Sequence, residues 1–122
     1  MSSTRVISAA QGRVQMQVFL ALPRYPFTRA AIEFAPEESG VFGLFEGQEL
    51  IYIGRADDRH QRSLRALLLL HQDGAMTGCT MKASHYTWEI VSIGAAARET
   101  EILARYFQTH RRQPRCCEPN AA

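Results

Sequence analysis

The chain has 122 residues, of which 46% are hydrophobic and 21% are charged, and its formal net charge at pH 7 is +2. This length suits one domain with one modest core rather than two domains, and the composition is ordinary for a soluble globular protein. No apolar run approaches the length of a membrane span, and the N-terminus lacks the charged-then-apolar order of a signal peptide. We therefore expect a single cytoplasmic domain that does not enter a membrane.

The cysteines bear on the redox compartment of the protein, and the cations bear on its ligands. Cys79, Cys116 and Cys117 are an odd number and two are adjacent, which favours free thiols in a reducing compartment over a disulfide framework. Their spacing matches no standard zinc pattern. Lys82 is the only lysine among 14 cations, and arginine suits phosphate because its planar guanidinium donates two parallel hydrogen bonds. A GC-rich coding sequence would give the same arginine bias.

The first third of the chain predicts local structure and no recognisable chemistry. Residues 1–13 have no hydrophobic period, and we expect them to form a flexible arm. Apolar residues alternate with polar ones over 14–20, which predicts a strand that Pro23 ends. Thr28 is the expected N-cap of a short helix that extends to Phe34.

The most informative stretch is a predicted β-hairpin in the middle of a small sheet. Two apolar runs, 40–45 and 49–54, flank a polar loop that contains Gly47. With a two- or four-residue loop, Phe42 would point to the face opposite Tyr52. With a three-residue loop, the two rings would share one face. Gly47 could supply the left-handed residue that such a loop needs.

Three further elements complete the predicted fold. The pattern predicts a helix over 61–71, a strand over 85–93 and a helix over 95–110. The stripe of the first helix consists of Leu64, Leu67, Leu68 and His71. We therefore predict an α/β (α+β) sandwich in which a small central antiparallel sheet is flanked by helices. One domain is expected over 14–117, followed by a frayed tail at 118–122.

Glu99 is the candidate with the clearest physical argument. The inward stripe of the last helix is made of Ala95, Ile102, Leu103, Tyr106 and His110. Glu99 falls inside this stripe, and a carboxylate that faces a core costs several kcal/mol unless it is paired or binds a cation. Two interpretations are open, a metal ligand or an ion pair with Arg55 or Arg65. Glu101 lies on the outer face, where Arg105 is its expected partner.

Together these residues resemble the GIY-YIG nuclease family. The triplets Gly-Val-Phe at 40–42 and Tyr-Ile-Gly at 52–54 are followed by a helix that ends at His71 and a helix that carries Glu99. The resemblance covers residues 38–117 and is to small stand-alone bacterial members related to the nuclease module of the ABC excinuclease. It implies a GIY-YIG-like sandwich and a DNA endonuclease of repair or recombination that hydrolyses phosphodiester bonds with one Mg²⁺ or Mn²⁺.

The resemblance also implies a role for each site residue. Glu99 is the implied metal ligand, Tyr52 positions or deprotonates the attacking water, Arg55 lies close to the phosphate, and His71 assists. The alternatives are an aromatic core residue for Tyr52, a solvated strand end for Arg55 and a satisfied core histidine for His71. The cations expected to bind DNA phosphate are Arg55, Arg62, Arg65 and Lys82.

Three family positions carry other residues in this chain. Phe42 stands where the family has its first tyrosine, Leu67 where it has an arginine, and Cys117 where it has an asparagine. Arg65 is two residues from Leu67, which turns it about 200° around the helix. Because losing one charge-stabilising donor typically costs about a hundred- to a thousand-fold in rate, a weak nuclease or a catalytically inactive nucleic-acid-binding module of the same fold is expected. A protein-interaction domain is a third interpretation.

Overall fold

The structure is a computed structural model that describes residues 19–57 and 62–118. Its elements in chain order are β1 (Tyr25–Pro26), α2 (Arg29–Ile32), β2 (Gly40–Glu46), β3 (Glu49–Ala56), α3 (Leu64–Gln72), the 3-10 helix η2 (Cys79–Lys82), β4 (His85–Ile90), α4 (Ala95–His110) and the 3-10 helix η3 (Arg115–Cys117). The arm predicted at 1–13 and residues 119–122 of the predicted tail lie outside the described residues.

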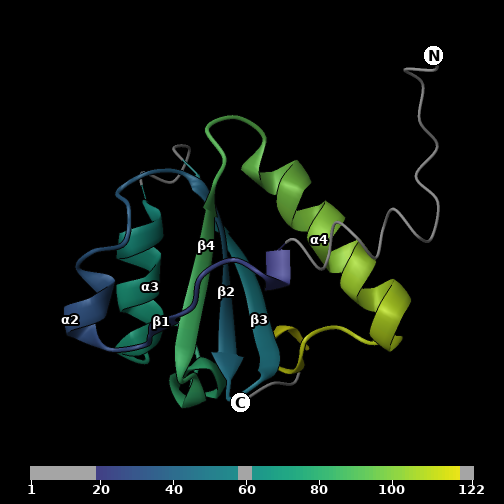
Figure 1. The fold of residues 1–122 in the computed structure, drawn as a ribbon, viewed down its shortest axis with the longest axis horizontal. Helices are drawn as coiled ribbons and strands as arrows, with labels where there is room; N and C mark the ends of the chain where they lie inside the picture. The colour runs from purple at the N-terminus through teal and green to yellow at the C-terminus, as the bar shows by residue number, and fades with distance from the viewer. Residues whose placement is uncertain (1–18, 58–61, 119–122) are drawn as a thin grey trace.

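The four strands form one antiparallel sheet in the order β1-β4-β2-β3. Helices α2 and α3 lie on one side of this sheet and α4 lies on the other (Figure 1). The predicted α+β architecture, a small antiparallel sheet flanked by helices, is confirmed. The hairpin was predicted to lie in the middle of the sheet. This is confirmed for β2, which is an inner strand, and wrong for β3, which forms one edge of the sheet.

Each face of the sheet has its own hydrophobic core. The core beneath α2 and α3 includes Phe27, Ile32, Phe42, Leu44, Ile51, Leu64, Leu68 and Tyr86. The core beneath α4 consists of Phe19, Val41, Phe45, Leu50, Ile53, Ile102 and Tyr106. Successive residues of a strand point to opposite faces, so two covered faces explain why six consecutive residues of β2 are buried. Burying each side chain of this size contributes about 1.5–3 kcal/mol.

The hairpin combines a two-residue turn with a β-bulge. Phe45 is opposite Leu50, but Leu44 is opposite Tyr52, so Ile51 is an extra residue in β3. The three-residue loop implied by the family is therefore wrong. The expected consequence is nevertheless confirmed, because the bulge turns Tyr52 back to the face of Phe42 and their ring centroids are 5.9 Å apart. Gly47 has a φ of 60°, as the first position of such a turn favours.

The helices begin and end close to the predicted residues. Thr28 caps α2 as predicted, accepting a hydrogen bond from Ala31 N at 3.2 Å. α3 begins three residues later than expected because Ser63 caps it. Residues 14–18 of the predicted N-terminal strand lie outside the described residues. Phe19 and Leu20 are helical rather than extended, and Phe19 is fully buried in the core beneath α4.

The cysteine prediction is wrong for two of the three residues. Cys79 in η2 and Cys116 in η3 form a disulfide, whereas Cys117 is free. Sequence spacing could not show this, because the pair depends on η2 and η3 folding next to each other. The argument for a reducing compartment is therefore lost, and a cytoplasmic location stays a prediction. In the part of the chain that the structure describes, no helix is long and apolar enough to cross a membrane.

The predicted partner of Glu101 is also wrong. Arg98 Nη1 contacts Glu101 at 2.8 Å, and the same guanidinium donates to both carboxylate oxygens of Glu89 in β4, at 2.9 and 3.0 Å. Arg105 instead donates to Gln108. Spacings of three and four residues both bring helix side chains together. The additional carboxylate of Glu89 on the neighbouring strand explains why Arg98 points this way.

Candidate functional site

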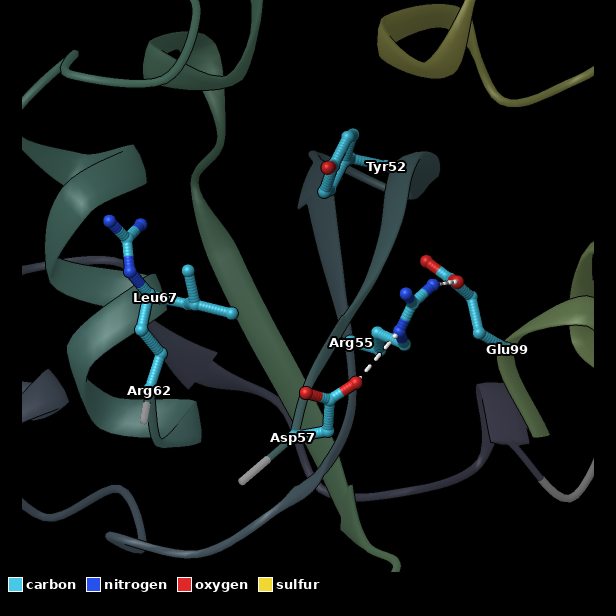
Figure 2. A pocket seen from close by; sticks show the side chains of 6 residues that line it. All are labelled: Tyr52, Arg55, Asp57, Arg62, Leu67 and Glu99. Carbon is cyan, nitrogen blue, oxygen red and sulfur yellow. Dashed lines mark hydrogen bonds and ion pairs between the residues drawn. The ribbon is translucent and has the colours of Figure 1, made fainter. Parts of the chain in front are cut away.

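A pocket of about 450 Å³ lies where α3 and α4 approach the edge strand β3. The described residues that line it are Tyr52, Arg55, Asp57, Arg62, Leu67 and Glu99. Tyr52 packs with the core beneath α3, whereas Glu99 comes from α4 on the other side of the sheet (Figure 2). The pocket thus brings together three of the four residues that the sequence predicted to be catalytic.

Arg55 is bound by two carboxylates. Its Nη1 donates to Glu99 Oε1 at 2.8 Å, and its Nε donates to Asp57 Oδ2 at 3.1 Å. The carboxylate side chains are 18% exposed for Glu99 and 20% exposed for Asp57, so both are largely withdrawn from solvent. The hydrogen bond to Glu99, followed by that to Asp57, raises the pKa of Arg55. The ion-pair interpretation of Glu99 named Arg55 or Arg65 as the partner, and the partner in the structure is Arg55.

Tyr52 is held between aromatic rings and stays protonated. Its ring centroid lies 4.8 Å from that of His71 and 5.9 Å from that of Phe42. Burial raises the pKa of Tyr52 to about 12, with smaller electrostatic contributions from Cys117 and Glu99. At neutral pH the hydroxyl is therefore a hydrogen-bond donor and acceptor, and not a phenolate.

Gly54 lies against the rings of Phe42 and Tyr52, and its lack of a side chain lets both rings pack at this position. A Cβ atom at this position would lie 2.7 Å from Phe42 Cζ and 2.7 Å from Tyr52 Cε2. Real Cβ contacts are essentially never so short, so one of the rings would have to move. The glycine of the Tyr-Ile-Gly triplet is thus explained by close packing and not by backbone conformation.

His71 is a buried core residue that supports Tyr52. It is 1% exposed and is not among the described residues that line the pocket. Its Nδ1 lies 2.9 Å from Thr80 Oγ1, and the Thr80 hydroxyl donates to Thr77 O. Because that hydroxyl has one proton, Nδ1 must be the donor to Thr80. Burial lowers the pKa of His71 to about 4, so the imidazole is neutral at pH 7 and positions the Tyr52 ring.

Of the four predicted DNA-binding cations, Arg55 and Arg62 line the pocket. Figure 2 shows Arg62 beside Leu67, across the pocket from Glu99, and within 19–57 and 62–118 Arg62 makes no hydrogen bond or ion pair. Arg65 was also expected to bind phosphate, but it is not among the described lining residues: it donates to Ala35 O at 2.8 Å and pairs with Glu37. Lys82 lies in η2 and is not among the described lining residues.

Asp57 is a pocket residue that the sequence reasoning missed. The signal was weak, because Asp57 is only two residues after Arg55 but lies beyond the end of β3, where strand alternation no longer shows which side chains share a face. Leu67 was predicted to be a core residue; it is 9% exposed and also forms part of the pocket wall. Leucine therefore occupies the wall at the position where the resemblance predicted an arginine.

The carboxylates of the pocket are the right donor type for Mg²⁺ or Mn²⁺, which prefer oxygen ligands. Glu99 lies in α4 and Asp57 follows β3, and both carboxylates contact the guanidinium of Arg55. Among the described residues, no group of three or more His, Cys, Asp or Glu side chains could form a complete protein cage. A cation held by Glu99 would therefore take most of its ligands from water, as Mg²⁺ commonly does.

Protein-family models, curated proteins and solved structures give no match to this chain. These comparisons neither support nor oppose a relation to the GIY-YIG family. That relation stays a prediction, which depends on the sequence motifs and on the arrangement of the pocket residues.

Proposed function

We propose that the protein is a GIY-YIG-type DNA endonuclease that hydrolyses phosphodiester bonds with Mg²⁺ or Mn²⁺. The observation that carries this proposal is the convergence of Tyr52, Arg55 and Glu99 on one pocket. The sequence suggests a different role for each of these residues, and they come from two elements, β3 and α4. Their three polar groups line one cavity at the edge of the sheet.

The chain supplies a distinct function at each wall of this pocket. A divalent cation at Glu99, when bound, would stabilise negative charge on the phosphate oxygens. Arg55 and Arg62 offer guanidinium groups suited to phosphate. Tyr52 is protonated at neutral pH, so its hydroxyl would orient the attacking water or a phosphate oxygen and would not remove a proton. The imidazole of His71 packs against the Tyr52 ring and positions it.

A second candidate is a nucleic-acid-binding module of the same fold that does not cleave. Two observations favour it: Leu67 stands in the wall where the family has an arginine, and Glu99 is occupied by Arg55. Such a module would use Arg55 and Arg62 to bind backbone phosphate. Its binding would be sensitive to salt and largely independent of sequence.

Nicking of supercoiled plasmid in Mn²⁺ or Mg²⁺ separates the two candidates. The nuclease proposal expects nicked circles from the wild-type protein and none from Glu99→Gln. Glu101→Gln is the matched control, because it removes a carboxylate from the same helix. The Glu101 carboxylate pairs with Arg98 and does not line the pocket. We expect Glu101→Gln to nick like the wild type.

Binding to a short DNA duplex at low and at moderate salt completes the test. Salt-sensitive binding without nicking in either metal would reject the nuclease and support the binding module. An absence of binding at low salt, with the divalent metal present, would reject both, because phosphate contacts are strongest at low salt. Nicking that persists in Glu99→Gln would show that the cleavage does not come from this pocket.

A further inference from the structure

We propose that Arg55 is exchanged between two partners: it holds Glu99 when the metal is absent, and it turns to the DNA phosphate when a divalent cation takes the carboxylate. This inference rests on the proposed function, since it concerns the same cation and the same phosphate. It adds that metal binding and phosphate binding strengthen each other through one side chain. We refer to the two contacts from Arg55 to Asp57 and Glu99 as the Arg55 bridge.

The geometry of the Arg55 bridge carries the first half of this inference. Nη1 and Nε of Arg55 point to carboxylates on different segments, α4 and the residue that follows β3. Figure 2 shows the guanidinium between the two acidic side chains. Oε1 of Glu99 accepts a hydrogen bond from Arg55 Nη1. A divalent cation bound to this oxygen would therefore compete with Nη1 for the same space and the same lone pairs of Oε1. The cation and the guanidinium are both positively charged, so they would also repel each other.

The charges of the lining residues and the exposure of Arg55 support the second half of this inference, in which Arg55 turns to the phosphate. The charged residues among the described lining are Arg55 and Arg62 against Asp57 and Glu99. While Arg55 is held by the two acids, Arg62 is the one cation among these residues that is left to attract a phosphate diester. The Arg55 side chain is the most exposed member of the bridge, at 39%, and it lines the cavity. Once released, it can reach a phosphate without a change in the backbone.

The inference predicts a reciprocal effect on two ligands. Removal of the guanidinium should improve Mn²⁺ binding, because the cation then has no competitor for Glu99. Removal of the Glu99 charge should improve metal-free DNA binding, because Arg55 is then freed. If metal binding raises the affinity for phosphate, phosphate binding must raise the affinity for the metal by the same factor.

The first test is titration of the full chain with Mn²⁺ alone, followed by calorimetry or by the paramagnetic resonance of free Mn²⁺. Arg55→Gln should bind Mn²⁺ about three- to tenfold more tightly than the wild type, which is the range for one charge-assisted contact of a half-exposed ion pair. Arg62→Gln removes the same charge from the same pocket without touching the bridge. It therefore measures the general electrostatic effect, which we expect to be smaller.

The second test needs no metal and uses fluorescence anisotropy of a short DNA duplex in EDTA. Glu99→Gln should bind the duplex several-fold more tightly than the wild type, by about the same factor as above. The gain should shrink when Glu99→Gln is placed on an Arg55→Gln background, because no guanidinium is then released. This double-mutant comparison separates release of Arg55 from the simple loss of one negative charge.

The outcomes distinguish this inference from the proposed function. If Mn²⁺ binds the wild type and Arg55→Gln equally well and is lost in Glu99→Gln, the metal site stands and the exchange of Arg55 is rejected. If neither the wild type nor Arg55→Gln binds Mn²⁺, both the metal-dependent function and the exchange are rejected. If Arg55→Gln binds Mn²⁺ more tightly than Arg62→Gln and no variant nicks DNA, the exchange is supported and the nuclease is not.

Discussion

The disulfide between Cys79 and Cys116 gives the most direct quantitative prediction. The two residues are 37 positions apart, so the bond closes a loop of that length in the unfolded chain. In the chain-entropy account, closing a loop of this size lowers the entropy of the unfolded state by an amount equivalent to about 4 kcal/mol at 25 °C. A domain of this size has a total stability of about 5–15 kcal/mol. Loss of the bond should therefore remove a large part of it.

The assay is urea unfolding of a Cys117→Ser variant, oxidised and then reduced with a phosphine. The substitution leaves one possible disulfide, because Cys117 is the free cysteine. We expect the free energy of unfolding to fall by about 4 kcal/mol on reduction. The double variant Cys79→Ser, Cys117→Ser should match the reduced protein and should not respond to the phosphine.

Two results would refute this reasoning. The first is an oxidised and a reduced protein that unfold with the same free energy, which would mean that the bond does not restrict the unfolded chain as assumed. The second is a native protein with three titratable thiols, which would mean that the pair is not joined. In that case the inference of a reducing compartment would regain its basis.

Three further predictions concern the pocket and its supports. Because the pKa of His71 is about 4 in the folded protein and about 6.5 in the unfolded chain, the unfolded state binds more protons between these values. The His71 contribution to stability should thus be complete above pH 6.5 and lost as pH falls towards 4, by about 3 kcal/mol in unfolding free energy; an equal pH slope in His71→Gln would contradict it. Gly54→Ala should lower the unfolding free energy by about 1–3 kcal/mol, because its Cβ would meet the rings of Phe42 and Tyr52; unchanged urea unfolding would show that the rings can yield freely. Leu67→Arg should raise the plasmid nicking rate by about a hundredfold if this wall faces the developing phosphate charge, with Leu67→Met as the size-matched control; equal rates in the two variants would place the phosphate elsewhere.

Much of the fold could be predicted because its signals are local. The apolar stripe of α3 and the start and end of α4 follow from helical periodicity, and the structure confirms both. The register of the hairpin could not be predicted in the same way. Every position from Leu50 to Ile53 is aromatic or aliphatic, so alternation does not indicate which face each residue occupies. The two cores decide the register, and they place the bulge at Ile51.

A residue of the candidate site could be predicted where the pattern of its own helix or strand singles it out. Glu99 could be selected because it interrupts an apolar stripe on its own helix. Its contact with Arg55 could be named only as one of two alternatives, since the choice between Arg55 and Arg65 depends on where α3 and α4 lie relative to β3. The disulfide was missed for the same reason. It depends on two segments that are distant in sequence and adjacent in space.

The position of β3 at the edge of the sheet explains how the pocket can exist at all. Tyr52 and Arg55 are three residues apart in one strand, so their side chains leave opposite faces of the sheet. In an inner strand, neighbours on both sides would separate them, and a residue on α4 could not share a cavity with Tyr52. At the edge, the two faces meet, and Glu99 from α4 and Leu67 from α3 close the cavity around the strand. A phosphate that bound in this pocket would therefore approach along this edge, and a chain that paired with β3 would cover the residues that are proposed to act on it.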